Sequence, residues 1–180
     1  MFCSKMDILG LLDNKALKAV EKRNRIGDGI QAGAITVRDI RALESTLDDK
    51  KLSLVLEAME AVTRKQPEIA EPGWLSLAQR HITAQSNSVK REASRVAGNI
   101  AHLYPDDLEP VIRNLLKNAS NEGTVVRWSS AYALGRIVSI PHHACGGLYG
   151  VVSALYERET DSGVKNQYLS GLKKAKKMRG

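Results

Sequence analysis

The sequence has few of the residues that define a fold by cross-linking or by large aromatic clusters. Its 180 residues include two cysteines, Cys3 and Cys145, which are too few for a disulfide framework. Aromatic residues are limited to one Phe, two Trp and five Tyr. We therefore expect a reduced, cytoplasmic protein whose core consists mainly of alanine and aliphatic side chains.

Long apolar runs are also missing. No segment approaches the roughly 20 consecutive apolar residues that a transmembrane helix requires. The first residues, Met1 to Leu12, lack the apolar core and the small-residue cleavage site of a signal peptide. The sequence thus predicts neither a membrane span nor a secretory leader, and its 43% hydrophobic content argues against extensive disorder.

Acidic residues are outnumbered, which gives a net charge of +7. The excess lies mainly in the second half, because residues 91–180 carry 13 basic and 8 acidic side chains. Its densest part is the C-terminal run of Lys173, Lys174, Lys176, Lys177 and Arg179. This run is typical of a solvated, partly frayed terminus, although it is also compatible with an anionic partner.

What the sequence does contain is an internal repeat. Residues 126–138 echo residues 89–101 at a spacing of 37, so that Val126, Gly135 and Ile137 match Val89, Gly98 and Ile100. Proline falls at the same place in three successive units, at Pro67, Pro105 and Pro141. A period of this length is the signature of a stacked repeat protein.

The apolar spacing within each unit predicts two helices and no strand. We expect Asn14 to cap a helix that the glycines at 27–33 end, Thr36 and Asp48 to begin the next two helices, and one helix to run from about 143 to 159. The chain is then one domain, 1–180, with atypical N-terminal capping helices in 1–35 and repeats in 36–178.

The pattern Val-Arg-x-x-small-small-x-Ala-Leu-Gly-x-Ile at residues 126–137 resembles HEAT repeats, and residues 89–100 match it well. The resemblance covers roughly residues 36–178 and concerns the fold alone, because these residues pack helices and carry no chemistry. It implies an all-α superhelix, a HEAT-repeat solenoid of about four to five helix pairs. It also implies that the second helix of each pair lines the concave surface.

A helical wheel of the second helices places basic and aromatic side chains, together with Asn99, opposite the apolar arc. The predicted partner-binding row consists of Arg91, Arg95, Trp128, Tyr132, Arg136, Lys174 and Lys177. Such a row can hold an acidic protein segment, with Trp and Arg as anchors, or a nucleic acid through phosphate pairing and base stacking. Equally, the arginines can be a solvated face, and Trp128 can simply cover the gap between two repeats.

Four other residues have structural interpretations. The resemblance implies that Lys90 and Arg127 are struts between repeats, bonded to acids or carbonyls of the turns. Gly98 and Gly135 fit close packing between helices better than a phosphate loop.

Signs of catalysis or cofactor binding are weak. His142, His143 and Cys145 lie together, but a zinc site needs four ligands and no second pair exists nearby in the sequence. The sequence lacks a Gly-rich phosphate loop, a serine elbow and a helical His-Glu-x-x-His. We therefore expect no metal, no cofactor and no enzymatic activity.

These observations favour a non-enzymatic scaffold that binds a protein partner on the concave face. The alternative is a nucleic-acid-binding protein that uses the basic row. HEAT-like alkylpurine DNA glycosylases are similar in repeat type, in charge and in Trp128 with Arg136, but a carboxylate beside the aromatic pair is not evident here. The HEAT-like repeats of phycobilin lyases also resemble the 126–138 unit through its packing residues, with no tetrapyrrole site to match.

Overall fold

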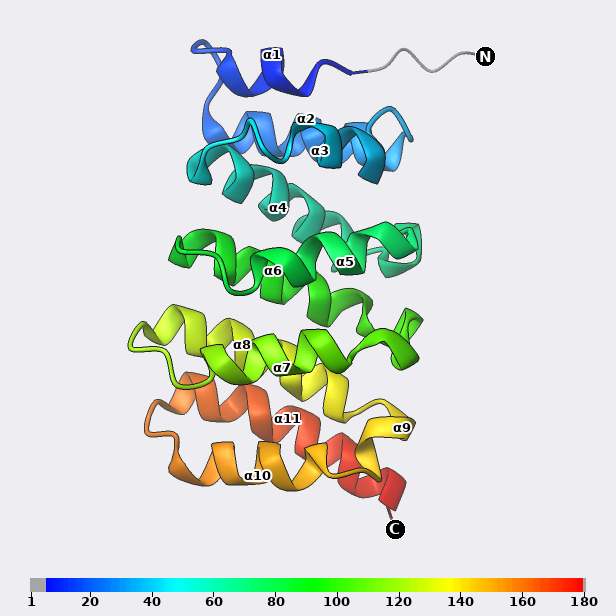
Figure 1. The fold of residues 1–180 in the computed structure, drawn as a ribbon, viewed down its shortest axis with the longest axis vertical. Helices are drawn as coiled ribbons and strands as arrows, with labels where there is room; N and C mark the ends of the chain where they lie inside the picture. The colour runs from blue at the N-terminus through cyan, green and yellow to red at the C-terminus, as the bar shows by residue number, and fades with distance from the viewer. Residues whose placement is uncertain (1–5, 180) are drawn as a thin grey trace.

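The protein is a single column of stacked helices, seen from end to end in Figure 1. The computed structural model describes residues 6–179, and these residues contain no strand. The helices form five consecutive pairs. The first helices of the pairs are α1 (Ile8–Asp13), α3 (Val37–Leu43), α5 (Pro72–His81), α7 (Glu109–Asn118) and α10 (Leu148–Arg158). The second helices are α2 (Ala19–Gln31), α4 (Asp49–Thr63), α6 (Asn87–Ile100), α8 (Thr124–Val138) and α11 (Ser162–Arg179). The predicted all-α solenoid of four to five pairs is confirmed.

Short helical turns connect the pairs where the repeated prolines occur. They are η1 (Pro67–Ile69), η2 (Ala101–Leu103), η3 (Pro105–Asp107) and α9 (Pro141–Ala144). Pro67, Pro105 and Pro141 each occupy the first position of such a turn. Proline suits this position because its missing N–H would have no partner there and its fixed φ is helical.

Side-chain caps explain where several helices begin. The Thr36 side chain accepts from the N–H of Asp39, whose carboxylate accepts in return from the Thr36 N–H, which is a capping box for α3. Asp48 caps α4 by accepting from the Lys51 N–H. The predicted cap at Asn14 is wrong. Its side chain accepts from the N–H of Ala16 in a local turn, and α2 begins only at Ala19.

Glycines account for two further differences from the predicted helices. Gly27 and Gly29 lie inside α2, where they are buried, and only Gly33, with φ of 69°, follows its end in the left-handed conformation. The helix expected over 143–159 is in fact α9 and α10, separated around Gly146 and Gly147.

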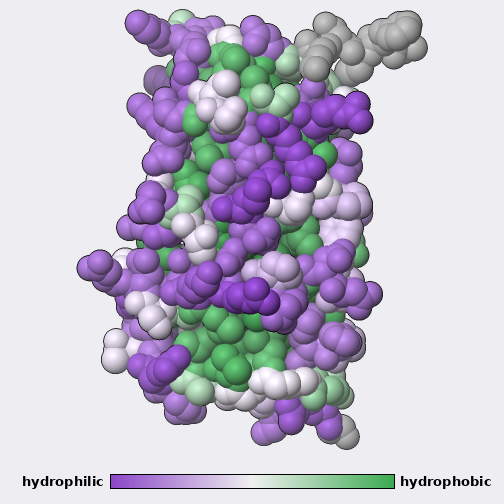
Figure 2. Space-filling view, in the orientation of Figure 1, coloured by the Kyte–Doolittle hydropathy of each residue, from purple (hydrophilic) through white to green (hydrophobic). Residues whose placement is uncertain are grey.

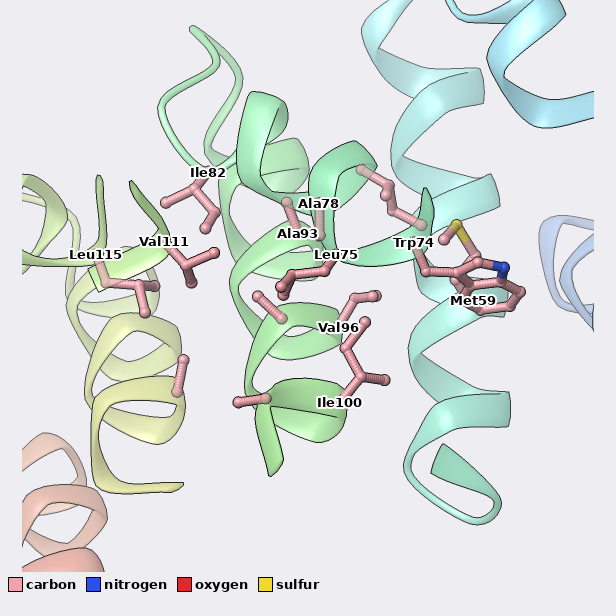
Figure 3. Close-up of a cluster of buried hydrophobic side chains, with 14 of the residues drawn as sticks. Met59, Trp74, Leu75, Ala78, Ile82, Ala93, Val96, Ile100, Val111 and Leu115 are labelled. Atoms are coloured by element: carbon pink, nitrogen blue, oxygen red, sulfur yellow. The ribbon is translucent and has the colours of Figure 1, made fainter. Parts of the chain in front are cut away.

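The core is one continuous apolar spine. Figure 3 shows side chains from successive pairs filling the space between them, including Met59 of α4, Trp74 of α5, Ile100 of α6 and Leu115 of α7. Four apolar residues at repeated positions are completely buried: Val89, Val126, Ile137 and Val164. Because one pair has too little surface to bury its own apolar stripe, each pair depends on its neighbours for stability.

Neighbouring second helices approach one another closely at glycines. A Cβ at Gly98 would lie 2.8 Å from the Cα of Ala133 in α8, and one at Gly135 would lie 2.5 Å from the carbonyl oxygen of Gln167 in α11. One at Gly171 would collide with the carbonyl oxygen of Gly135. The interpretation of Gly98 and Gly135 as close-packing positions is therefore confirmed.

The surface is mostly hydrophilic in the view of Figure 2, with an apolar area toward the C-terminal end. Large exposed hydrophobic residues of the described chain lie on different helices, among them Val20 of α2, Val125 of α8 and Val151 of α10. None of the helices described here is long and apolar enough to cross a membrane.

Candidate partner-binding face

The predicted row lies on the second helices α6, α8 and α11, and we call their surface, together with that of α4, the second-helix face. Along this face the structure divides the predicted residues into two groups. Arg91 and Arg95 of α6 are partly buried in ion pairs, whereas Arg136 and Lys174 are exposed beside a pocket. The row is therefore not one uniform basic stripe.

Arg95 lies between two buried carboxylates. Its Nη2 is 2.8 Å from Oε1 of Glu60 in α4, and its Nη1 is 3.1 Å from Oε2 of Glu92 in α6. Arg91 pairs with the other oxygen of Glu92. Glu60 and Glu92 are 2% and 0% exposed, so the charges of these arginines serve to compensate carboxylates that water does not reach.

Burial affects the protonation of this cluster. Removal of Glu92 from water raises the pKa of its carboxyl above the ordinary glutamate value, and the neighbouring Arg91 and Arg95 oppose that rise. Burial also raises the pKa of the Tyr132 hydroxyl. Both groups favour their uncharged forms more than they would in water.

A chain of hydrogen bonds joins three second helices below this cluster. The Tyr132 hydroxyl of α8 donates to Oδ1 of Asn99 in α6 at 2.6 Å. The Asn99 amide donates to the hydroxyl of Thr63 in α4 at 3.1 Å and to the Glu60 carbonyl at 3.3 Å. Asn99 is only 2% exposed, so it belongs to the packing and not to the exposed row in which the helical wheel placed it.

The second group begins with an aromatic stack. The rings of Trp128 and Tyr132 lie 5.5 Å apart between centroids and 17° from parallel. The guanidinium carbon of Arg136 lies 4.6 Å from the centroid of the Tyr132 ring, on the next turn of α8. Stacking and the cation–π contact hold these three side chains in one ridge along the helix. Trp128 also lies near Gly163 at the start of α11, so it covers the gap between two repeats as well.

Beside this ridge, α8 and α11 enclose a small polar pocket of about 190 Å³. Its charged lining is Arg136 and Lys174, and the remaining lining residues are neutral: Tyr132, Gly135, Ser139, Gln167, Ser170 and Gly171. Neither Arg136 nor Lys174 has a carboxylate within ion-pair distance among residues 6–179. The pocket is thus a concentration of unpaired positive charge on the second-helix face.

Lys177, the remaining residue of the predicted row, and Arg179 of the C-terminal run lie in different surroundings. Lys177 is exposed but does not line the pocket. The expectation of a frayed terminus is wrong for Arg179, because α11 is helical to that residue. Its guanidinium bonds the Ala144 carbonyl oxygen at 3.3 Å and lies over the Tyr149 ring at 4.3 Å.

The strut interpretation is confirmed for Arg127. Its guanidinium pairs with Glu159 in the turn between α10 and α11, at 3.0 Å, and also bonds the carbonyl oxygens of Asn121 and Glu122. Burial acts to raise the pKa of Glu159, but bonds from the N–H groups of Asp161 and Thr160 and from Arg127 leave it below the ordinary value. For Lys90, residues 6–179 show no corresponding ion pair.

Sequence reasoning missed Glu60 and Glu92. Glu92 lies three positions after Val89, at the margin of the apolar arc, and Glu60 aligns with Gly98 at a spacing of 38. A charged residue at a position that other repeats give to a packing glycine was the available signal. Such a buried charge requires a counterion from a nearby helix, which Arg95 supplies here.

The histidine pair does not belong to this face. His142 and His143 make an edge-to-face contact, and Nε2 of His143 lies 3.1 Å from the Pro105 carbonyl oxygen of the preceding repeat. Residues 6–179 contain no group of three or more His, Cys, Asp or Glu side chains placed to hold a metal ion.

Comparison with known proteins supports the fold. No protein-family model matches the sequence, and no curated protein matches it. Among solved structures, it is similar to the crystal structure of an engineered protein from the Northeast Structural Genomics Consortium. The TM-score is 0.53 and the identity 14%, over 96% of this chain and 98% of that one. The class is therefore an α-helical repeat solenoid, which is the fold that the predicted resemblance implies.

Proposed function

We propose that this protein is a non-enzymatic scaffold that binds an acidic segment of a protein partner on its second-helix face. The observation that carries the proposal is the ridge of Trp128, Tyr132 and Arg136 beside a pocket whose two cations lack counterions. Tryptophan, tyrosine and arginine are the residues that most often dominate binding energy at protein interfaces. The stack orders them before binding, which lowers the entropic cost of association.

The carboxylates near the ridge support a binding role more than a catalytic one. A general base must be able to reach a substrate proton in its ionised form. Glu60 and Glu92 are instead buried and bonded to Arg91 and Arg95. Their removal from solvent leaves the exposed part of the face with aromatic, amide, hydroxyl and cationic groups.

The alternative function is nucleic-acid binding, which the stacked Trp128 and Tyr132 favour because bases stack on such rings. Affinity for a nucleic acid depends on a track of cations that can each neutralise a phosphate. Arg91 and Arg95 are already bonded to carboxylates, so such a track is interrupted in the middle of the face. We therefore rank this function second.

The test is affinity capture from the native cell with matched surface variants. We expect Trp128→Ala and Arg136→Glu to lose the same captured proteins, because both remove parts of one ridge. Arg113→Glu, an equally large charge change on the exposed side of α7, should retain them. Loss with Arg113→Glu and retention with both ridge variants would refute the proposal.

A parallel titration addresses the alternative. Fluorescence anisotropy with labelled single- and double-stranded DNA of arbitrary sequence, at low and physiological salt, should show weak binding that salt abolishes. Tight binding at physiological salt that depends on Trp128 and Arg136 would instead establish the nucleic-acid function.

A further inference from the structure

We infer that the pocket between α8 and α11 binds a phosphate monoester carried by the protein partner, which is a phosphorylated serine or threonine side chain. The inference rests on the proposed function and specifies the ligand of its central pocket. It begins from Arg136 and Lys174, which extend from different helices to line the same pocket.

Several other arginines that face a neighbouring helix or turn are ion-paired, whereas Arg136 and Lys174 are not paired with any of residues 6–179. Arg23, Arg80, Arg95 and Arg127 each pair with a glutamate of another helix or turn. Arg136 instead lies over the Tyr132 ring, which orients its guanidinium without neutralising it. Two like charges that converge without a counterion repel one another, so a bound anion would relieve an existing repulsion.

Two of the residues that line the pocket, Gly135 and Gly171, are glycines for a steric reason. Gly135 and Gly171 meet where α8 crosses α11, and a Cβ at either glycine would collide with backbone atoms of the opposite helix. The crossing therefore brings the two helix backbones into contact, and both glycines line the pocket beside that contact. A volume of about 190 Å³ suits a small oxyanion group and part of the chain that carries it.

Neutral groups around the pocket provide further contacts. The side chains of Gln167 and Ser170 make no hydrogen bond to another side chain among residues 6–179, so both retain donors for a ligand. The Ser139 hydroxyl is already engaged, because it donates to the Arg136 carbonyl oxygen at 2.7 Å. Two cations and two neutral donors match the three oxygens of a phosphate monoester.

Charge favours phosphate over carboxylate. A phosphorylated serine carries about −1.5 to −2 charges at pH 7, whereas a glutamate carries one. A single guanidinium is enough to bind a carboxylate through two parallel bonds. A site with two unpaired cations on separate helices is better neutralised by the dianion.

The ridge indicates what should lie near the phosphate. Trp128 and Arg136 are eight residues apart on α8, which is about 12 Å along a helix axis. An extended peptide covers this distance in about three to four residues. We therefore expect an apolar residue that contacts Trp128 to lie three or four positions from the phosphorylated one.

The experiment uses three synthetic peptides with blocked ends that differ at one position. Each carries a leucine, three glycines and then phosphoserine, glutamate or serine. Binding is measured by isothermal titration calorimetry and by the fluorescence of a Trp74→Phe protein, in which Trp128 is the remaining tryptophan. Inorganic phosphate is titrated separately, as is a labelled single-stranded DNA.

We expect the phosphoserine peptide to bind at least tenfold more tightly than the glutamate peptide and the serine peptide not to bind detectably. The double variant Arg136→Gln, Lys174→Gln should lose at least tenfold in affinity. The matched control Arg113→Gln, Lys117→Gln removes the same charge from the exposed surface of α7 and should change affinity less than twofold.

Several outcomes would overturn the inference. Equal binding of the glutamate peptide would make the pocket a carboxylate site, and equal binding of inorganic phosphate would make it a site for the free ion. Stronger binding of the DNA would assign the pocket to a nucleic acid, and an unaffected double variant would exclude the pocket. If partner capture depends on both Trp128 and Arg136 but the three peptides bind alike, the proposed function stands and this inference fails.

Discussion

Two boundaries between second helices show how the same repeat position can close a surface or leave it open. Between α4 and α6, Glu60 occupies the position that aligns with Gly98 and pairs with Arg95. Between α8 and α11, the corresponding region contains Gly135, which faces Gly171 with no side chain between them. The first boundary neutralises its own charge, and the second leaves a pocket lined by Arg136 and Lys174.

The comparison teaches that a basic residue on this face has a role that depends on its neighbours across the boundary. Arg95 and Arg136 are both arginines on the outer side of a second helix, and the helical wheel groups them together. Arg95 has two buried carboxylates within reach, and Arg136 has an aromatic ring and a pocket. The first arginine stabilises the stack, and the second is available to a partner.

The largest expected effect on stability comes from removing the ion pair between α4 and α6. Arg95→Met should lower the free energy of unfolding by about 2–3 kcal/mol, because it leaves buried Glu60 without its close counterion. Arg136→Met should change it by less than about 0.5 kcal/mol, as an exposed substitution does. Urea denaturation followed by circular dichroism measures both variants. Similar losses of stability for Arg95→Met and Arg136→Met would contradict the division of the second-helix face into an ion-paired group and an unpaired group.

The next largest effect on stability is expected at the crossing of α8 and α11. Gly171→Ala should destabilise the protein by about 1–2 kcal/mol, because its methyl group would collide with the Gly135 carbonyl and force α8 and α11 apart. The control is Gly150→Ala in α10, where a Cβ meets open space and the higher helix propensity of alanine should stabilise by up to about 1 kcal/mol. Thermal melts of both variants test the contrast in sign, and a stabilising Gly171→Ala would show that the crossing tolerates a side chain.

The smallest expected effect is on the pH dependence of stability, which should change in opposite directions when Glu92 and Glu159 are replaced. The raised pKa of Glu92 means that its stabilising contribution is present below the ordinary glutamate pKa and is lost as pH rises through the folded-state value. Glu92→Gln should therefore gain stability relative to the unchanged protein as pH rises from about 4.

For Glu159 the folded-state pKa is lowered, so its contribution is present above the ordinary pKa and is lost as pH falls through the folded-state value. Glu159→Gln should accordingly lose relative stability over the same rise in pH. Urea denaturation at a series of pH values measures both differences. Parallel trends in the two variants would refute the assignment of these shifts.

Much of the fold could be predicted because it depends on local and periodic information. The recurrence of Val89 at Val126, the prolines and the cap at Thr36 identified helices, their order and their buried sides. The break at Gly146 and Gly147 was not predicted, because the apolar spacing after it, at Leu148, Val152 and Leu155, does not mark where the helix begins. The real start of α2 was missed because Asn14 satisfies a local turn as readily as a helix cap.

The candidate site was predicted only in part. The wheel grouped Trp128, Tyr132 and Arg136 correctly, since residues four apart share a helix face. It also placed Asn99 on the surface, although this side chain is buried between α4 and α8. Contacts between helices more than 30 residues apart decide such cases, and a wheel drawn for one helix does not contain them.

By itself, the sequence determined that this protein is a stack of helix pairs with a continuous apolar spine, because the burial pattern repeats along the chain. Only the tertiary structure decided which charges are free. Ion pairing depends on distances of a few ångströms between different repeats, and those distances are set where Glu60 or a glycine meets the next helix.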